Sequence, residues 1–209
     1  MNSHLPVVKI KICGMTCIED TLLAVEGGAD AVGFIFYKKS PRYVSEKLVK
    51  SIISKLPPFV ETVGVFVDES EDRINRIVDS CKLDAVQLHG DESPAFCNKI
   101  NRKVIKAVRV KGLDSFIDLP SYKVSAFLLD TYSEGQQGGT GQVFDWGLVN
   151  EGKKYGPVIL AGGLDPANVT HAIQKAKPYG VDVCSGVEKT PGVKSPVKLR
   201  AFIKTVKGW

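Results

Sequence analysis

Residues 158–166, Val-Ile-Leu-Ala-Gly-Gly-Leu-Asp-Pro, contain the pattern from which the architecture follows. A short apolar run ends in two glycines. The pair Asp165-Pro166 then places an N-cap and a first-turn proline ahead of a helical pattern over Ala167–Lys175. Apolar runs of this length are typical of strands buried on both faces of a parallel sheet. The stretch therefore predicts one β-strand, one glycine-containing loop and one helix.

The same unit recurs along the whole chain. Short runs rich in valine and isoleucine predict strands at Val8–Cys13, Ala31–Phe36, Thr62–Val67, Ala85–Leu88, Val104–Val108, Ala126–Leu129, Val158–Ala161 and Val181–Cys184. Helical patterns separate these runs, so the sequence predicts an α/β fold, a single-domain (β/α)8 TIM barrel. Such barrels typically have about 250 residues. A chain of 209 residues is therefore a compact version.

An open, doubly wound sheet is the alternative architecture. The number of strand patterns disfavours it, and no Gly-x-Gly-x-x-Gly motif follows the first strand. No linker, low-complexity stretch or repeat divides the chain, so residues 1–209 are assigned to one barrel domain.

Several of the predicted helices have recognisable start signals. Thr16-Cys17-Ile18-Glu19 has the spacing of a capping box ahead of Thr21–Glu26. The predicted caps of the other longer helices are Ser45 for Glu46–Lys55, Ser70 for Glu71–Cys81 and Ser195 for Val197–Val206. Shorter helices are expected at Ser93–Ile100, at about Leu113–Ile117 and at about Trp146–Val149.

The composition is that of a soluble globular protein, with 44% hydrophobic and 24% charged residues. The net charge of +5 is spread along the chain without a basic block, which argues against nucleic acid as a partner. No run approaches the roughly 18 apolar residues that a membrane span needs. Met1–Pro6 is too short and too polar for a signal peptide. We therefore expect a cytoplasmic protein with no membrane partner.

The five cysteines do not predict a disulfide framework, because their number is odd and the chain has no mark of secretion. They are Cys13, Cys17, Cys81, Cys97 and Cys184. No cluster of cysteine and histidine has the spacing of a zinc site, so no metal is expected.

In a (β/α)8 barrel the active site lies at the carboxyl ends of the strands. Cys13 ends the first predicted strand, where a thiolate could act as a base or nucleophile, although a buried structural thiol is an equally good interpretation. Strand alternation then points Lys11 into the barrel below Cys13, where an ammonium group would favour the thiolate. A buried ammonium needs a partner, and Asp182 on the last strand is the candidate.

Asp130 ends the sixth predicted strand. No clear helical pattern follows it that it could cap, since the next residues are the glycine-rich Gly135–Gly141. A carboxyl group half-buried at a barrel mouth can keep its proton to a higher pH and act as an acid. A functional role is therefore favoured for Asp130.

Two short glycine-containing segments, Gly162-Gly163 and Ser185-Gly186, follow the seventh and eighth predicted strands. In barrels the loops after these two strands often bind phosphate through backbone N–H groups. Ordinary turn glycines are the alternative. The residues Ser185–Glu188 could also begin a short extra helix whose N-terminus faces the anion.

Arg42 and His89 are further candidates for substrate binding. Arg42 follows the second strand, and its guanidinium group suits a planar carboxylate, although a solvated loop charge is the simpler interpretation. His89 follows the fourth strand and could contact substrate or be a satisfied residue of the barrel mouth.

Taken in order, these motifs resemble those of the phosphoribosylanthranilate isomerase family. The resemblance spans nearly the whole chain. It rests on Lys11–Thr16, Gly33–Phe36, Ser40–Arg42, Val63–Val67, Gln87–Gly90, Leu128–Asp130, Gly138–Gly141, Phe144–Trp146, Leu160–Leu164, Val181–Val183, Ser185–Glu188 and Pro191–Lys194. The chain departs from the family at Cys184, where serine is more usual, and at Ser195, where an acidic residue is expected.

The resemblance implies an Amadori rearrangement in tryptophan biosynthesis, without metal or cofactor. Asp130 would protonate the ribose ring oxygen of N-(5-phosphoribosyl)anthranilate, and Cys13 would remove the C2 proton. Arg42 would hold the anthranilate part, and the glycine loops would hold the phosphate. The small-molecule phosphorylated substrate is thus the expected partner, and the chain is expected to be a monomer or a homodimer.

Three other functions are possible for such a barrel. The related histidine-pathway isomerase, or an enzyme serving both pathways, would use similar chemistry, but that family has an aspartate base where this chain has Cys13. Indole-glycerol-phosphate synthase shares the fold, but is longer and uses a catalytic lysine. A non-catalytic phosphate-binding barrel would have lost the acid or the base, and this chain has both Cys13 and Asp130.

Overall fold

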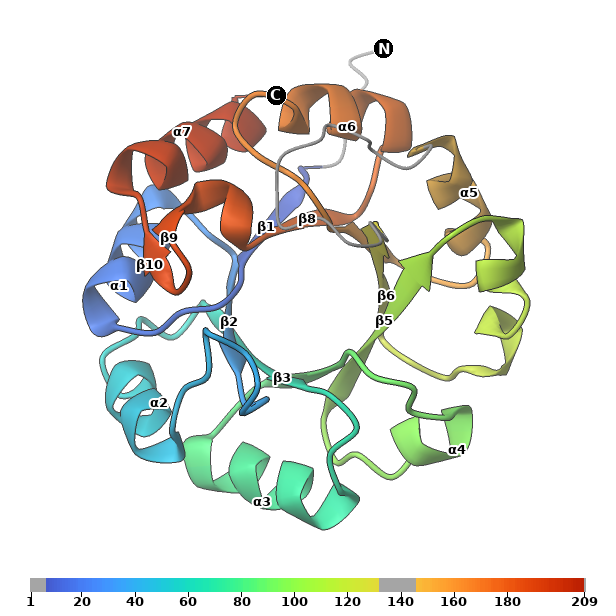
Figure 1. Ribbon diagram of the computed structural model, residues 1–209, viewed down its shortest axis with the longest axis horizontal. Coiled ribbons are helices and arrows are strands. Elements are labelled where there is room, and N and C mark those ends of the chain that lie inside the picture. Colours follow the sequence, from blue (N-terminus) through green and yellow to red (C-terminus); the bar gives the residue numbers. More distant parts are fainter. Residues whose placement is uncertain (1–6, 132–145, 209) are drawn as a thin grey trace.

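The computed structural model describes residues 7–131 and 146–208, which form one closed eight-stranded barrel (Figure 1). The strands are β1 (Lys9–Ile12), β2 (Ala31–Ile35), β3 (Glu61–Phe66), β4 (Ala85–Leu88), β5 (Lys103–Val110), β6 (Ala126–Thr131), β7 (Val158–Leu160) and β8 (Gly180–Val183). Each pairs in parallel with its neighbour in sequence, and β1 closes the barrel by pairing with β8. The predicted (β/α)8 barrel is confirmed, with all eight strands at their expected places.

Helices surround the barrel on the outside (Figure 1). They are α1 (Ile18–Gly27), α2 (Glu46–Ile53), α3 (Glu71–Cys81), α4 (Pro94–Cys97), α5 (Val149–Gly152), α6 (Val169–Ala176) and α7 (Pro196–Lys207). After β5 the expected helix is replaced by two 3-10 turns, η1 (Leu113–Phe116) and η2 (Leu119–Ser121), and η3 (Trp146–Leu148) leads into α5. None of the helices in the described parts of the chain is both long and apolar enough to cross a membrane.

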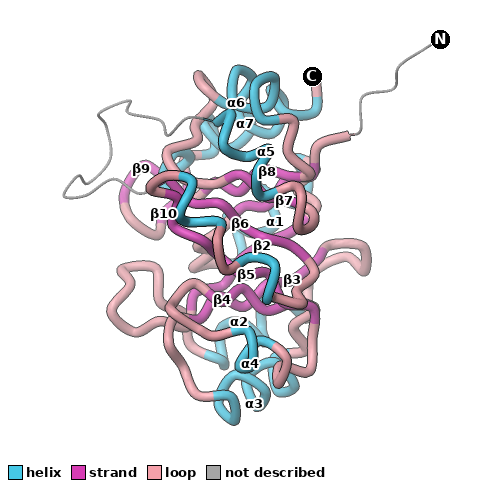
Figure 2. The backbone as a smooth tube through the Cα atoms, turned by 90° about the vertical axis from the view of Figure 1, so that its right-hand side faces the viewer, coloured by secondary structure: helices cyan, strands magenta, loops and turns pink. Residues whose placement is uncertain are grey.

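The core has two layers, which the alternation of each strand separates. Large side chains such as Ile10, Phe34 and Phe66 pack between the barrel and the helices. A second apolar cluster, rich in alanine, lies inside the barrel and includes Ala85 and Leu128. The side view shows the strands as a central layer with helices above and below (Figure 2).

The predicted capping box at the start of α1 is wrong. The N-cap of α1 is Cys17, which makes no side-chain cap bond. The hydroxyl of Thr16 instead donates to the carbonyl oxygen of Gly192, a residue distant in sequence. A long-range contact has therefore replaced the local one.

The start of α6 also differs from the prediction. The helix begins at Val169, with Asn168 as its N-cap. The carboxylate of Asp165 accepts hydrogen bonds from the backbone N–H groups of Ala167 (2.7 Å) and Asn168 (2.9 Å). Asp165 thus closes the turn before the helix and does not cap the helix itself. The caps Ser45 and Ser195 are confirmed by side-chain bonds to Leu48 N and Lys198 N.

After β8 the chain makes the 3-10 turn η4 (Ser185–Val187), followed by a two-stranded hairpin of β9 (Glu188–Thr190) and β10 (Val193–Lys194). The expected extra helix is therefore only a single turn. The hairpin has no strong signal in the sequence, because its strands are too short to show alternation.

Candidate active site

The carboxyl ends of the parallel strands bring the predicted site residues to one rim of the barrel. Cys13 follows β1, Arg42 follows β2, His89 follows β4 and Asp130 lies near the end of β6. Gly162-Gly163 follows β7, and Ser185-Gly186 follows β8. The segment from 132 to 145, which includes the glycine-rich Gly135–Gly141, lies outside the described residues.

Cys13 is 5% exposed, and both its backbone N–H and its backbone carbonyl form hydrogen bonds. Its N–H donates to the carbonyl oxygen of Val183 (2.9 Å), and its own carbonyl accepts from the ammonium of Lys194 (2.6 Å). The hydrogen bond from the thiol of Cys184 lowers the pKa of Cys13 well below its usual value, and the ammonium groups of Lys11 and Lys194 add to this effect. They outweigh burial, which acts in the opposite direction. Cys13 is therefore suited to be a thiolate.

The predicted pair of Lys11 and Asp182 is present inside the barrel. The Lys11 Nζ lies 3.0 Å from Asp182 Oδ1, and both side chains are buried. Burial would lower the pKa of Lys11, but the negative charges of Asp182 and Cys13 outweigh it and raise the pKa. Burial also raises the pKa of Asp182 to about 6, against the opposing effect of the Lys11 ammonium. The ammonium thus lies between two groups that it helps to ionise.

Asp130 is joined to a chain of hydrogen bonds that sequence reasoning did not foresee. Its Oδ2 lies 3.2 Å from His89 Nε2, and His89 Nδ1 lies 2.9 Å from the side-chain nitrogen of Gln87. An amide nitrogen only donates, so Nδ1 accepts and the Nε2 proton points at Asp130. Gln87 is buried, and its Oε1 has no partner among the described residues. Gln87 and His89 thus hold the carboxyl group of Asp130 in one orientation.

Arg42 makes a bidentate ion pair with Glu188. Its Nε donates to Oε1 (2.8 Å) and its Nη2 to Oε2 (2.7 Å). The hydrogen bonds to Glu188 raise the pKa of Arg42 above its usual value. This pair uses two of the five N–H donors of a guanidinium group, so three are left for a second anion.

The loops after β7 and β8 meet through their backbones. Gly162 (φ 82°) and Gly163 (φ 64°) both have left-handed conformations, which glycine adopts without strain. A Cβ atom at Gly186 would collide with the carbonyl oxygen of Leu164. The two predicted phosphate loops therefore lie against each other, as a shared anion site requires.

Two charged residues of this rim were missed by reasoning from side-chain chemistry. The side chain of Lys194 is 0% exposed, and its ammonium donates to Glu188 Oε1 (3.1 Å) and to the carbonyl oxygens of Cys13 and Cys184. Glu188 thus lies between Lys194 and Arg42. A lysine in a polar turn is usually solvated, and only the resemblance had included both residues in its motifs.

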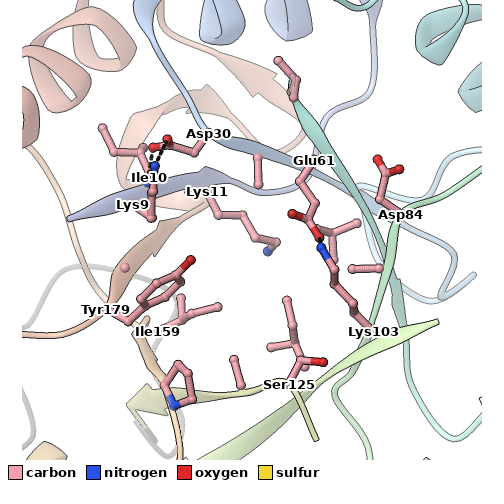
Figure 3. Close-up of a pocket in the computed structure, with 18 of the residues that line it drawn as sticks. Lys9, Ile10, Lys11, Asp30, Glu61, Asp84, Lys103, Ser125, Ile159 and Tyr179 are labelled. Carbon is pink, nitrogen blue, oxygen red and sulfur yellow. Dashed lines mark hydrogen bonds and ion pairs between the residues drawn. The ribbon is translucent and has the colours of Figure 1, made fainter. Parts of the chain in front are cut away.

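A cavity of about 580 Å³ lies at the opposite end of the barrel (Figure 3). Its lining includes Lys9, Lys11, Phe59, Ile159 and Tyr179. Lys11 extends into it from β1, and the ion pairs Lys9–Asp30 and Lys103–Glu61 flank it (Figure 3). This cavity is open at the amino ends of the strands, away from Cys13 and Asp130. Among the described residues, no group of histidine, cysteine, aspartate or glutamate could hold a metal ion.

A closed (β/α)8 barrel with a buried thiol, a carboxyl group and two glycine-containing loops at one mouth has the arrangement of a barrel enzyme. Residues 10–205 match the family of N-(5'-phosphoribosyl)anthranilate (PRA) isomerase. The N-(5'-phosphoribosyl)anthranilate isomerase of Geotalea uraniireducens (strain Rf4) is 54% identical over 97% of this chain and 100% of its own length. This chain belongs to the phosphoribosylanthranilate isomerase family.

Solved structures agree with this assignment. A phosphoribosylanthranilate isomerase in complex with reduced 1-(o-carboxyphenylamino)-1-deoxyribulose 5-phosphate is 42% identical, with a TM-score of 0.86 over 97% of this chain and all of the other. Mutually generated monomers of the dimeric enzyme from Thermotoga maritima show the same identity, coverage and TM-score.

Proposed function

We propose that this chain converts N-(5-phosphoribosyl)anthranilate to 1-(2-carboxyphenylamino)-1-deoxyribulose 5-phosphate in L-tryptophan biosynthesis, as a cofactor-independent aldose–ketose isomerase. Membership of the family supports this activity, and so does the relative that was crystallised with a reduced form of this product. The observation that contributes most is the thiol of Cys13, buried at the barrel mouth with its pKa well below the usual value. Phosphorylated substrates cross membranes poorly because they are charged, which supports a cytoplasmic location.

The proposed mechanism uses one acid and one base. Asp130 protonates the ribose ring oxygen, so that the C1–O bond breaks and a Schiff base forms with the anthranilate nitrogen. Cys13, as the thiolate, removes the proton from C2 and leaves an enolamine, which tautomerises to the ketone. Cys13 follows β1 and Asp130 lies on β6, three strands away around the barrel, and this separation supports an acid and a base on different sides of the mouth.

The remaining site residues bind the substrate or support the catalytic groups. The backbone N–H groups of Gly162, Gly163, Ser185 and Gly186 hold the phosphate. The free donors of Arg42 bind the anthranilate carboxylate. His89 contacts substrate beside Asp130, and Lys11 with Asp182 supports the thiolate.

The decisive experiment follows the loss of fluorescence from freshly made phosphoribosylanthranilate. Replacing Cys13 with serine or Asp130 with asparagine should lower kcat about 100-fold or more, because each removes a proton-transfer group. Cys81→Ser is the matched control, since Cys81 is a buried thiol on α3, away from the rim. Equal rates for all four proteins would exclude the assignment of acid and base.

We also propose that the chain forms a homodimer through the amino ends of its strands. Phe59 is 95% exposed in the loop before β3 and lines the cavity at the amino ends of the strands. Twofold symmetry would place the exposed ring of each copy at the cavity of the other, so that the two surfaces are self-complementary. The dimeric Thermotoga relative supports the same state.

Light scattering tests the dimer. The wild type should have twice the chain mass of 22.7 kDa, and Phe59→Glu should have the mass of one chain. Leu113→Glu is the control, because Leu113 is also exposed (63%) but follows β5 at the other end of the barrel. A wild type of single-chain mass at micromolar concentration would contradict this proposal.

A further inference from the structure

Two cysteines lie side by side at the barrel mouth. Ile12 of β1 pairs with Val183 of β8, and Cys13 and Cys184 follow these residues on the two adjacent strands. The ammonium of Lys194 donates to both of their carbonyl oxygens, at 2.6 and 3.1 Å. Neighbouring strands are about 4.8 Å apart, and the Cα atoms of a disulfide are about 4.4 to 6.8 Å apart. The usual spacing of adjacent strands is therefore within the range that a disulfide needs.

Both side chains lie on the same strand faces as Lys11 and Asp182, which pair two residues earlier on β1 and β8. The thiol of Cys184 hydrogen-bonds to Cys13, and this contact is the largest cause of the lowered pKa of Cys13. A Cβ atom at Gly33 would lie 2.9 Å from Cys13 Sγ, and one at Gly14 would lie 2.8 Å from Cys184 Sγ. Glycine at both positions thus leaves room for the two sulfur atoms. Cys184 has a second acceptor in Glu188 Oε1, at 3.9 Å.

The other three thiols do not share this environment. Burial raises the pKa of Cys17, Cys81 and Cys97 above the usual value, so they remain protonated and weakly nucleophilic. Thiolate character favours oxidation, and among the five thiols it is greatest for Cys13.

We propose that Cys13 and Cys184 form a peroxide-sensitive dithiol, whose closure to a disulfide reversibly switches off the active site. The loss of activity rests on the proposed role of Cys13 as the base. The formation of the disulfide does not, since it depends only on the two sulfur atoms.

The chemistry is a two-electron oxidation by hydrogen peroxide. The Cys13 thiolate attacks one peroxide oxygen, the O–O bond breaks, and a sulfenic acid and hydroxide form. The sulfur of Cys184 then attacks the Cys13 sulfur, an S–S bond forms, the S–O bond breaks, and the thiol proton leaves with the oxygen as water. The two sulfur atoms lose two electrons in total, and peroxide is reduced to hydroxide and water.

Cys184 becomes able to complete the second step once the first has taken place. Its pKa is well above the usual value, chiefly because it hydrogen-bonds to the Cys13 sulfur. A sulfenic acid is neutral, so oxidation of Cys13 removes the neighbouring negative charge. The ammonium of Lys194, with its Nζ 3.9 Å from Cys184 Sγ, and the guanidinium of Arg42 then favour the thiolate of Cys184.

The test treats the full chain with hydrogen peroxide, blocks free thiols with iodoacetamide and identifies linked peptides by mass spectrometry. The wild type should give one peptide that joins Cys13 and Cys184, two hydrogen masses lighter than the sum of its parts. Isomerase activity should fall with the same time course and return on treatment with dithiothreitol. Cys184→Ser should give no link, and its Cys13 should proceed to the sulfinic acid, which dithiothreitol does not reverse.

Cys17→Ser is the matched control, because Cys17 is the other thiol close to Cys13 in sequence. In the Cys17→Ser variant the disulfide between Cys13 and Cys184 should form at the wild-type rate. A wild type in which Cys13 is oxidised to the sulfinic acid as fast as in Cys184→Ser would overturn the dithiol, as would a link between Cys13 and Cys17. A Cys13–Cys184 disulfide without loss of activity would leave the pair in place and refute the role of Cys13 as the base.

Discussion

At the level of single residues, Cys13 differs from the other thiols through its neighbours. Two ammonium groups and a second thiol surround it, and together they outweigh the cost of burying a negative charge. Lys11 is the most informative of these neighbours, because its Nζ is fixed by an ion pair to Asp182 below the thiol. The charge of Lys11 therefore acts on Cys13 from a defined position.

Replacing Lys11 with methionine should raise the pKa of the Cys13 thiol. The ammonium favours the thiolate, so its loss leaves the protonated form more stable to a higher pH. The rate of alkylation of Cys13 by iodoacetamide, measured against pH, should shift to higher pH. Lys9→Met is the control, since Lys9 is on the same strand but largely exposed and paired with Asp30. An unchanged profile in Lys11→Met would show that Lys11 does not activate the thiol.

At the level of secondary-structure elements, the proposed phosphate site depends on how the loops after β7 and β8 pack. Gly186 approaches the backbone at Leu164 so closely that no side chain fits between them. Backbone atoms cannot move aside as a flexible side chain can. The spacing of the two loops is thus determined by the absence of one Cβ atom.

Gly186→Ala should separate these loops and weaken phosphate binding. We expect KM for phosphoribosylanthranilate to rise about tenfold, equivalent to about 1.4 kcal/mol of binding, with a smaller change in kcat. Steady-state kinetics measure both. Gly112→Ala is the control, because a Cβ atom there meets nothing within 4 Å. A normal KM in Gly186→Ala would argue against a phosphate site between these loops.

At the level of the whole molecule, the closed barrel forces charged groups into its interior. Asp182 of β8 and Lys11 of β1 are buried together inside the barrel, where they form an ion pair. A parallel barrel has no edge through which these side chains could reach water. The protein therefore retains buried ion pairs that lower its stability at some pH values.

The free energy of unfolding should depend on pH, because burying the charged form of Asp182 is unfavourable. Its folded pKa of about 6 lies above the usual 3.8, so between these values the folded protein binds more protons than the unfolded chain. The contribution of this group to stability is therefore present below about pH 4 and is lost as pH rises to about 6. The shift corresponds to a free energy on the order of 3 kcal/mol.

Urea unfolding of wild type and Asp182→Asn at several pH values measures this effect. The difference in unfolding free energy, wild type minus variant, should fall as pH rises from about 4 to about 6 and stay constant above. A difference that rises with pH would show that the Lys11 ammonium outweighs burial and lowers the pKa of Asp182.

Local patterns were sufficient to predict the barrel and most of its helices. Continuous apolar runs predict buried strands, and Ser45 and Ser195 mark helix starts, because both features depend on residues close in sequence. The ends of the strands then located Cys13 and Asp130 at one mouth. The same reasoning failed at Thr16, whose hydroxyl bonds a residue far along the chain.

The amino-acid sequence by itself therefore determined the architecture, the end of the barrel that holds the site and the side chains with suitable chemistry. The environment of those side chains came from folding, because it is made by residues such as Lys194, which lies 181 positions from the Cys13 carbonyl that it binds. The ionisation of a thiol depends on charges within a few ångströms. Such distances exist only after β1 and β8 have paired.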